Sequence, residues 1–213
     1  MNLIILQNTL PKVFANKQIK SDIWLWEVSF IKGNTYLIEA NSGCGKTSLC
    51  SYIYGNRNDY TGNILFDNTN IKNLNNTAWN DIRKQNISIL FQDLKLFPEL
   101  SAIENVNLKN SLTNHKTKEE ILTLFDQLEL TDRINQPIAK MSWGQQQRVA
   151  LIRALCQPFD FLILDEPISH IDKYNANLMK QIIIDESKKQ KAGIIATSIG
   201  SSIDLDYTQT LQL

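Results

Sequence analysis

Residues 40–48 read ANSGCGKTS and combine the residue types that hold a phosphate group. An apolar segment, TYLIEA at 35–40, leads into a tight glycine turn, and Gly-Lys-Thr then opens a segment with helical character. In that arrangement, backbone N–H groups and the helix N-terminus face the anion. The Lys46 ammonium can reach β- and γ-phosphates, and the Thr47 hydroxyl can bind Mg²⁺. We therefore predict a phosphate-binding loop formed by Ala40, Asn41, Ser42, Gly43, Cys44, Gly45, Lys46, Thr47 and Ser48.

The second chemical signal is a pair of adjacent carboxylates in FLILDEP, residues 161–167. The apolar residues before them place Asp165 and Glu166 at the carboxyl end of a buried strand, where ligands bind in open α/β sheets. Asp165 would hold Mg²⁺, directly or through water, and Glu166 would take a proton from an attacking water. Many strands end in Asp-Glu without such a role, so the pattern gains its meaning from the phosphate-binding loop upstream.

Alternating strands and helices must position these residues. In the expected strand 24–31, alternation places Trp24, Trp26, Val28 and Phe30 on one face, which favours packing over ligand binding. Residues 99–156 have a mainly helical pattern, with capping boxes at 101–104 and 117–120. The alternation predicts an α/β fold with a mostly parallel sheet. The other expected strands are 3–7, 35–40, 61–68, 87–93, 159–167, 193–198 and 207–213, and a further helix is expected over 173–190.

Composition narrows the class of protein. The chain has 213 residues, of which 43% are hydrophobic, enough to bury a substantial core. Lysine plus arginine equals aspartate plus glutamate at 22 each, so no cationic excess predicts a nucleic-acid partner. Cys44, Cys50 and Cys156 lack metal-ligand spacing and are expected to be reduced thiols. No apolar stretch is long enough for a signal peptide or a membrane span, so we expect membrane association only through a partner.

Five segments occur in the order and approximate spacing of an ABC-type ATPase domain: ANSGCGKT, FQD at 91–93, MSWGQQQR at 141–148, FLILDEP and SHID at 169–172. The chain resembles that family over nearly its whole length. The resemblance implies a phosphate-loop NTPase core with a mostly parallel sheet, a small antiparallel β part and a helical signature subdomain. Residues 1–213 are then expected to form a single ABC-type ATPase domain, with the helical subdomain at about 99–156.

The resemblance also implies residue roles. MSWGQQQR is similar to the family's signature motif, in which Ser142 and Gly144 contact the γ-phosphate of ATP held by the partner chain, and Gln145 holds the ribose side. Nothing in the folding of a helix calls for its run of three glutamines. Gln92 matches the glutamine that touches Mg²⁺ and the attacking water and couples to a transmembrane subunit. Asp172 matches an aspartate that communicates across the dimer.

Phe14 is the candidate for the aromatic ring that stacks on adenine, although a core or surface role for it is equally open. Two positions depart from the family. Trp143 replaces the first signature glycine, where it would narrow the approach or pack against neighbours. Ser198 occupies the position of a histidine that contacts the γ-phosphate, and a serine lacks the positive charge of an imidazole. We therefore expect ATP binding and dimer closure to be intact and turnover to be slow, with Ser198 in the catalytic position of the histidine. A bolder alternative is that His170 substitutes from the neighbouring subunit.

The resemblance implies an ATP-dependent subunit of an ABC transporter, similar in size to lipoprotein-release and macrolide-export ATPases. Its cofactors would be ATP and Mg²⁺. Its partners would be a second ATPase subunit, identical or paralogous, and transmembrane permease subunits at the cytoplasmic face of the membrane. Segment 94–106 would receive the permease or form a packing joint. Two alternatives remain: a nucleotide-gated regulatory module with weak hydrolysis, and an ATPase acting on DNA or ribosomes, whose usual second cassette or long insertion is not expected here.

Overall fold

A five-stranded parallel sheet forms the centre of the molecule in this computed structural model, which describes residues 1–169 and 171–213. Its strands lie in the order β6-β7-β8-β3-β9, and every pairing between neighbours is parallel. Their bounds are β3 Thr35–Glu39, β6 Ile87–Leu90, β7 Phe161–Asp165, β8 Gly193–Ser198 and β9 Gln209–Gln212. The expected parallel sheet is present, and the carboxyl ends of β3, β7 and β8 meet at one edge.

A second, antiparallel sheet has the strand order β2-β1-β4-β5. Its strands are β1 Leu3–Pro11, β2 Glu27–Ile31, β4 Tyr60–Phe66 and β5 Thr69–Asn70. The strand expected from residue 24 begins only at Glu27, because Leu25 adopts a left-handed φ of 66° and turns the chain. Trp24 is consequently buried at 2% exposure, whereas Trp26 is 63% exposed. The prediction that both tryptophans share one face of a strand is therefore wrong.

Six α-helices are described: α1 Lys46–Ile53, α2 Asn76–Gln85, α3 Ala102–Asn110, α4 Lys118–Gln127, α5 Trp143–Leu155 and α6 Lys173–Gln190. Short 3₁₀ turns occupy Lys12–Phe14, Ile71–Asn73, Thr131–Arg133 and Ile138–Lys140. Helix α2 has no counterpart in the sequence prediction, because it is short and its large apolar residues are just Trp79 and Ile82. Helices α3 and α4 begin at the two predicted capping boxes, at Ser101 and Thr117. Among the described residues, none of these helices combines the length and apolar character that crossing a bilayer requires.

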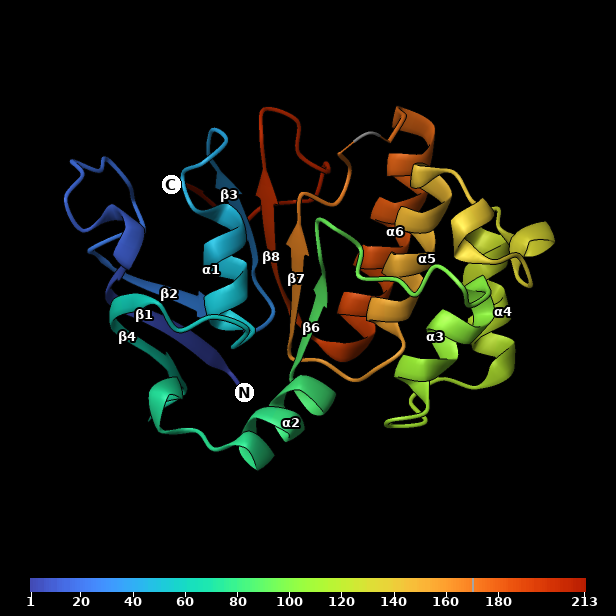
Figure 1. Cartoon of the computed structure of the whole chain (residues 1–213), viewed down its shortest axis with the longest axis horizontal. Coiled ribbons are helices and arrows are strands. Elements are labelled where there is room, and N and C mark those ends of the chain that lie inside the picture. The colour runs from blue at the N-terminus through green and yellow to red at the C-terminus, as the bar shows by residue number, and fades with distance from the viewer. Residues whose placement is uncertain (170) are drawn as a thin grey trace.

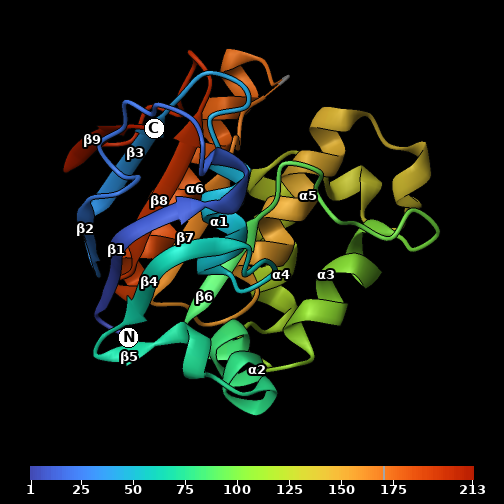
Figure 2. The ribbon, with the colours of Figure 1, turned by 60° about the vertical axis from the view of Figure 1, so that its left-hand side comes forward.

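Strand β7 of the central sheet is buried on both faces, and the two faces belong to different hydrophobic clusters. Phe161 and Ile163 of β7 join α1 and the antiparallel sheet in one cluster. Leu162 and Leu164 pack with α5, α6 and the helical segment in the other. Successive side chains of a strand point to opposite faces, so a continuous apolar run is what a doubly covered strand requires. Figure 1 shows this layering, and Figure 2 shows α3 and α5 on the side remote from the antiparallel sheet.

Candidate active site

The glycine-rich loop joins β3 to α1 at the edge where the parallel strands end. Gly43 and Gly45 have left-handed φ values of 82° and 103°. A Cβ placed on Gly45 would lie 3.1 Å from the Phe14 ring and 3.2 Å from the Trp24 ring, so only glycine fits. Gly45 is also the N-cap of α1, and no side chain in the described part of the chain caps this helix. Its first-turn N–H groups are therefore free to bind an anion.

Lys46 is buried at 4% exposure and folds back over this loop. Its ammonium donates hydrogen bonds to the carbonyl oxygens of Ala40, at 3.0 Å, and Asn41, at 3.1 Å. The same ammonium lies 3.5 Å from Oε1 of Glu166, which comes from the end of β7. The predicted phosphate-binding lysine and the predicted catalytic carboxylate are thus brought together although they are far apart in the sequence.

A hydrogen-bonded chain connects three of the predicted residues. The Thr47 hydroxyl donates to Oε1 of Gln92 at 3.3 Å, and the Gln92 amide nitrogen donates to Oε2 of Glu166 at 3.0 Å. Gln92 follows β6, so it reaches the site from the strand next to β7. The ion pair of Glu166 with Lys46 completes the cluster. Side chains from three separate segments therefore meet at one edge of the sheet.

Asp165 is the buried carboxylate of the site, at 2% exposure. The Thr197 hydroxyl donates to its Oδ1 at 2.9 Å. Burial raises the pKa of the Asp165 carboxyl above its ordinary value, and the hydroxyls of Thr197 and Thr47 oppose this shift. A carboxylate, a threonine hydroxyl and a glutamine carbonyl are oxygen ligands of the kind that Mg²⁺ prefers. Asp165, Thr47 and Gln92 therefore fit a magnesium site.

Glu166 has a backbone conformation that side-chain-bearing residues rarely adopt, with a φ of 52°. Such a conformation costs about 1–3 kcal/mol and persists only where surrounding contacts hold it. Here the Glu166 N–H donates to the Thr197 hydroxyl oxygen at 3.1 Å. Thr197 thus holds both acidic residues, through the side chain of one and the backbone of the other. Sequence reasoning missed Thr197, whose only signal is a polar residue near the carboxyl end of a buried strand.

The signature segment begins α5. Ser142 is its N-cap, and the Ser142 hydroxyl and the Gln145 side chain form a third capping box. Gln146 donates to the carbonyl oxygens of Met141 and Ile138, and Gln147 donates to that of Pro167, next to the catalytic segment. The expectation that folding does not call for these glutamines is therefore wrong, because each one bonds a specific backbone group.

Trp143 lies closer to this chain's own catalytic cluster than the sequence indicates. A cleft of about 480 Å³ is lined by Trp143 together with Thr47, Gln92, Asp165 and Glu166. The indole is 45% exposed. Ser142 and Gly144 do not line this cleft, and a Cβ placed on Gly144 would meet no atom within 4 Å. Ser142 is exposed and Gly144 is partly exposed, while the tryptophan between them contributes to the cleft in its own chain.

The remaining predicted residues occupy different parts of the site. Phe14 is half-buried against Gly45, with the Lys17 ammonium 5.3 Å from its ring centroid. Asp172 is exposed and caps α6, and its pKa is lowered by the hydrogen bond from the Asn175 N–H. Ser198 is 2% exposed and pairs in register with Glu39 of β3. Its hydroxyl has no hydrogen-bond partner among the described residues. The alternative that used His170 lies outside the described residues.

Comparison with known proteins decides the family. A family model described as ABC transporter matches residues 26–169, which is more than half of the chain. The chain belongs to the ABC transporter family. It is an ABC ATPase, and ATP binding and ATP hydrolysis are the activities of this family. The family resemblance, the fold class and the enzymatic activity expected from the sequence are thereby confirmed.

Individual relatives of this ABC ATPase agree with the family assignment. The uncharacterized ABC transporter ATP-binding protein YclH of Bacillus subtilis (strain 168) is 31% identical over 79% of this chain and 75% of its own length. The lipoprotein-releasing system ATP-binding protein LolD of Buchnera aphidicola subsp. Schizaphis graminum is 26% identical over 92% and 88%, respectively. A dimeric structure of MJ0796, a bacterial ABC transporter cassette, matches with a TM-score of 0.77 and 25% identity over 91% and 87%.

Proposed function

We propose that this ABC ATPase binds and hydrolyses ATP as one half of a dimer that powers a membrane transporter. The observation that carries the proposal is the cluster in which Lys46, Gln92 and Glu166 meet beside the glycine loop. In the proposed arrangement, residues 1–213 act as one ATPase domain with a helical subdomain at about 99–156. The dimer lies at the cytoplasmic face of the membrane, bound to permease subunits.

The glycine loop would hold the nucleotide phosphates through the free N–H groups of residues 40–48 and the Lys46 ammonium. Lys46 would then exchange its two backbone carbonyl partners for phosphate oxygens, as an ammonium binds either. Phe14, which already packs on the loop, is the side chain placed to stack on adenine. When bound at Thr47, Asp165 and Gln92, Mg²⁺ would neutralise charge on the phosphate oxygens.

Glu166 would accept the proton from the attacking water. Its carboxylate is held by two groups, the Lys46 ammonium and the Gln92 amide, so its orientation is set before nucleotide binds. Glu166 has a left-handed backbone conformation, and the Thr197 hydroxyl stabilises it by accepting the Glu166 N–H. Orientation of this kind lowers the barrier, because the proton acceptor needs no rearrangement in the transition state.

The signature segment would complete the site of the other subunit. Ser142 is exposed and Gly144 has open space around it, as a surface that receives a partner's γ-phosphate requires. The Gln145 side-chain oxygen accepts the Ser142 N–H, so its amide nitrogen remains the group that would donate to ribose. Asp172, exposed at the start of α6, is placed to signal across the same interface.

A groove next to Gln92 would receive the permease. It has a volume of about 260 Å³, and its rim carries Phe97 and Leu108, which are 52% and 47% exposed. Arg153 of α5 donates to the carbonyl oxygens of Leu94 and Lys95, which joins the segment after Gln92 to the signature helix. Segment 94–106 would therefore serve both expected roles, as the packing joint at its buried start and as the contact surface at Phe97.

ATP-driven dimerisation and turnover test the proposal. Glu166→Gln keeps the side-chain shape but cannot accept a proton, so it should bind ATP, remain dimeric and lose turnover by about 10²–10⁴-fold. Light scattering with and without ATP measures the dimer, and phosphate release measures turnover. A Glu166→Gln variant that stays monomeric in ATP, or that retains the wild-type rate, would contradict this function.

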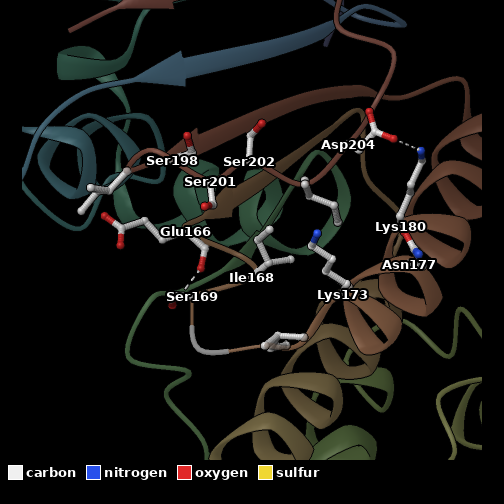
Figure 3. A pocket seen from close by; sticks show the side chains of 14 residues that line it. Glu166, Ile168, Ser169, Lys173, Asn177, Lys180, Ser198, Ser201, Ser202 and Asp204 are labelled. Atoms are coloured by element: carbon white, nitrogen blue, oxygen red, sulfur yellow. Dashed lines mark hydrogen bonds and ion pairs between the residues drawn. The ribbon is translucent and has the colours of Figure 1, made fainter.

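The regulatory module with weak hydrolysis is a second candidate, and Ser198 is the observation that favours it. The Ser198 hydroxyl carries no charge and has no hydrogen-bond partner within residues 1–169 and 171–213. Ser198 and Glu166 line the same cavity (Figure 3). Loss of a preorganised donor in the transition state commonly costs about 10²–10³ in rate. Turnover that stays low both alone and with the membrane partner, while ATP still drives dimerisation, would identify this second function. Turnover that the membrane partner strongly stimulates would identify a transport motor.

A further inference from the structure

Trp24 contacts the glycine loop from outside both the loop and the helix that follows it. The side chain is 2% exposed, and its indole N–H donates to the carbonyl oxygen of Cys44 at 3.2 Å. The same ring would lie 3.2 Å from a Cβ placed on Gly45. One buried side chain therefore holds two consecutive residues of the loop, the first by a hydrogen bond and the second by packing.

Trp24 is itself held in place by several contacts. Its backbone N–H donates to the Ser21 hydroxyl oxygen at 3.0 Å. The next residue, Leu25, has a left-handed backbone and donates its N–H to the Thr9 carbonyl oxygen of β1 at 3.0 Å. The indole also meets the Tyr52 ring of α1 edge-on, with ring centroids 6.5 Å apart. The indole is consequently a fixed support for the loop.

The hydrogen bond to Cys44 sets the direction of the next backbone N–H. In a planar trans peptide, the carbonyl oxygen and the N–H that follows it point in opposite directions. Because the Cys44 carbonyl oxygen points to the indole, the Gly45 N–H points away from it. No backbone carbonyl in the described part of the chain accepts this N–H. It is therefore a donor available to a ligand on the side of the loop opposite Trp24.

The glycines of the loop make such a support valuable. Gly43 and Gly45 have left-handed φ values, and glycine loses more conformational freedom on ordering than any other residue. If the loop were free to move, a bound phosphate chain would have to order it, and affinity would fall by the cost of that ordering. A side chain that orders the loop in advance removes this cost.

We propose that Trp24 is a positioning residue for phosphate binding, whose indole N–H holds the Cys44–Gly45 peptide so that the Gly45 N–H faces the phosphate chain of the nucleotide. The inference rests on the proposed function, which places the nucleotide phosphates in the loop of residues 40–48. Trp24 acts through the loop and does not itself contact phosphate. Loss of its N–H should therefore weaken the binding of a phosphate chain and leave recognition of the base unchanged.

Replacement of the indole N–H by sulfur tests this role. Trp24→benzothienylalanine, made by codon suppression in the full chain, keeps the shape of the ring but cannot donate to Cys44. The same replacement at Trp26, which is 63% exposed, is the matched control. Competition against a fluorescent ATP analogue gives the affinities of tripolyphosphate and of adenosine separately. One hydrogen bond corresponds to about 2- to 12-fold in affinity, so the Trp24 variant should bind tripolyphosphate about 2- to 12-fold more weakly and adenosine equally well.

Steady-state turnover gives a second readout. The contact of the Gly45 N–H with phosphate would be the same before and during reaction, so its loss should raise KM for ATP and leave kcat unchanged. A merely structural role would instead lower kcat and weaken adenosine together with tripolyphosphate.

Hydrogen exchange in the nucleotide-free chain reports on the loop directly. The Leu49 N–H donates to the Gly45 carbonyl oxygen at 2.8 Å, so its protection depends on how firmly Gly45 is held. Loss of one hydrogen bond should speed exchange at Leu49 by about 2- to 12-fold in the Trp24 variant. Ile195, buried in β8, should exchange at the wild-type rate and serves as the internal control.

The outcomes separate this inference from the proposed function. Unchanged tripolyphosphate affinity in the Trp24 variant, equal weakening of tripolyphosphate and adenosine, or equal weakening in the Trp26 variant would each overturn the positioning role. If the wild type binds and hydrolyses ATP while one of these results is found, the function is retained and the role of Trp24 is refuted. A wild type that binds no ATP would refute the function, and the Leu49 exchange rates would then decide whether Trp24 holds the loop.

Discussion

Thr197→Val isolates the residue that holds both carboxylates of the active site. Valine keeps the shape of threonine but removes the hydroxyl, which donates to Asp165 at 2.9 Å and accepts the Glu166 N–H at 3.1 Å. Thr197 is 1% exposed, so water does not replace either bond without rearrangement. A hydrogen bond to a charged group contributes about 1.5–3 kcal/mol, and an unpaired buried N–H costs about 1–3 kcal/mol. Because coupled losses are not additive, we expect unfolding free energy to fall by about 2–5 kcal/mol.

Urea denaturation measures this loss, with Thr197→Ser as the matched control because it keeps the hydroxyl. Burial already raises the pKa of Asp165, and the hydroxyl opposes that shift, so its removal raises the pKa further. A carboxyl whose pKa is raised in the folded state destabilises the fold increasingly as pH rises from the ordinary value, about 3.9, through the folded value. The Thr197→Val penalty should therefore be full at neutral pH and smaller in acid, where the carboxyl is protonated in both states.

The same variant tests the catalytic arrangement. Without the hydroxyl, the left-handed backbone at Glu166 loses its hydrogen bond, and the carboxylate loses its fixed aim. We expect turnover to fall by about 10- to 100-fold, as misplacement of a catalytic group commonly costs. If Thr197→Val and Thr197→Ser have the same stability and turnover, the assignment of Thr197 as the residue that positions both acids is refuted.

Three further predictions follow from single contacts. Because Trp143 lines the cleft that also contains Thr47 and Asp165, binding of Mg²⁺ and ATP should change tryptophan fluorescence emission. Trp143→Phe should remove most of that change. An equal change in the variant would contradict the placement of Trp143 in this cleft. Cys44 should be the cysteine that iodoacetamide modifies in the folded chain, with ATP slowing the reaction, because the other two are buried; modification that ATP leaves unaffected would count against the loop. Lys116 pairs with Glu186 at 2.6 Å, both nearly buried, so Lys116→Met should lower unfolding free energy by about 3–5 kcal/mol. Burial alone would raise the pKa of Glu186, but hydrogen bonds from Lys116 and a neighbouring lysine lower it below its ordinary value. The stability from this pair should therefore be present above the ordinary pKa of a glutamate and be lost as pH falls through the lowered pKa. Wild-type stability that does not change with pH over this range would refute the pair.

Much of the chemistry was predictable from local patterns. The glycine loop and the Asp165-Glu166 pair each lie in one short segment. The spacing of residues within each segment is enough to predict phosphate binding by the loop and a role for the two carboxylates. The capping boxes at Ser101 and Thr117 are equally local, since a helix N-terminus is decided within four residues. The family resemblance then placed Gln92 in the same site, and the structure brings its amide to Glu166.

Other features depend on which segments meet in space. Trp24 and Trp26 alternate as a strand would, yet the left-handed turn at Leu25 separates them, because docking against the glycine loop outweighs β propensity. Gln147 of the glutamine run donates to the carbonyl oxygen of Pro167, which is distant in the sequence. Local sequence carries no information about that partner.

By itself, the sequence determined the order of the catalytic segments, the alternation of strands and helices and the chemical groups available to phosphate and Mg²⁺. Tertiary structure decided that Thr197 meets both acids and that Trp143 lines its own chain's cleft. The physical reason is the parallel sheet. Its register pairs Asp165 with Thr197 and Glu39 with Ser198, and such long-range pairings are set by the packing of whole elements rather than by neighbours along the chain.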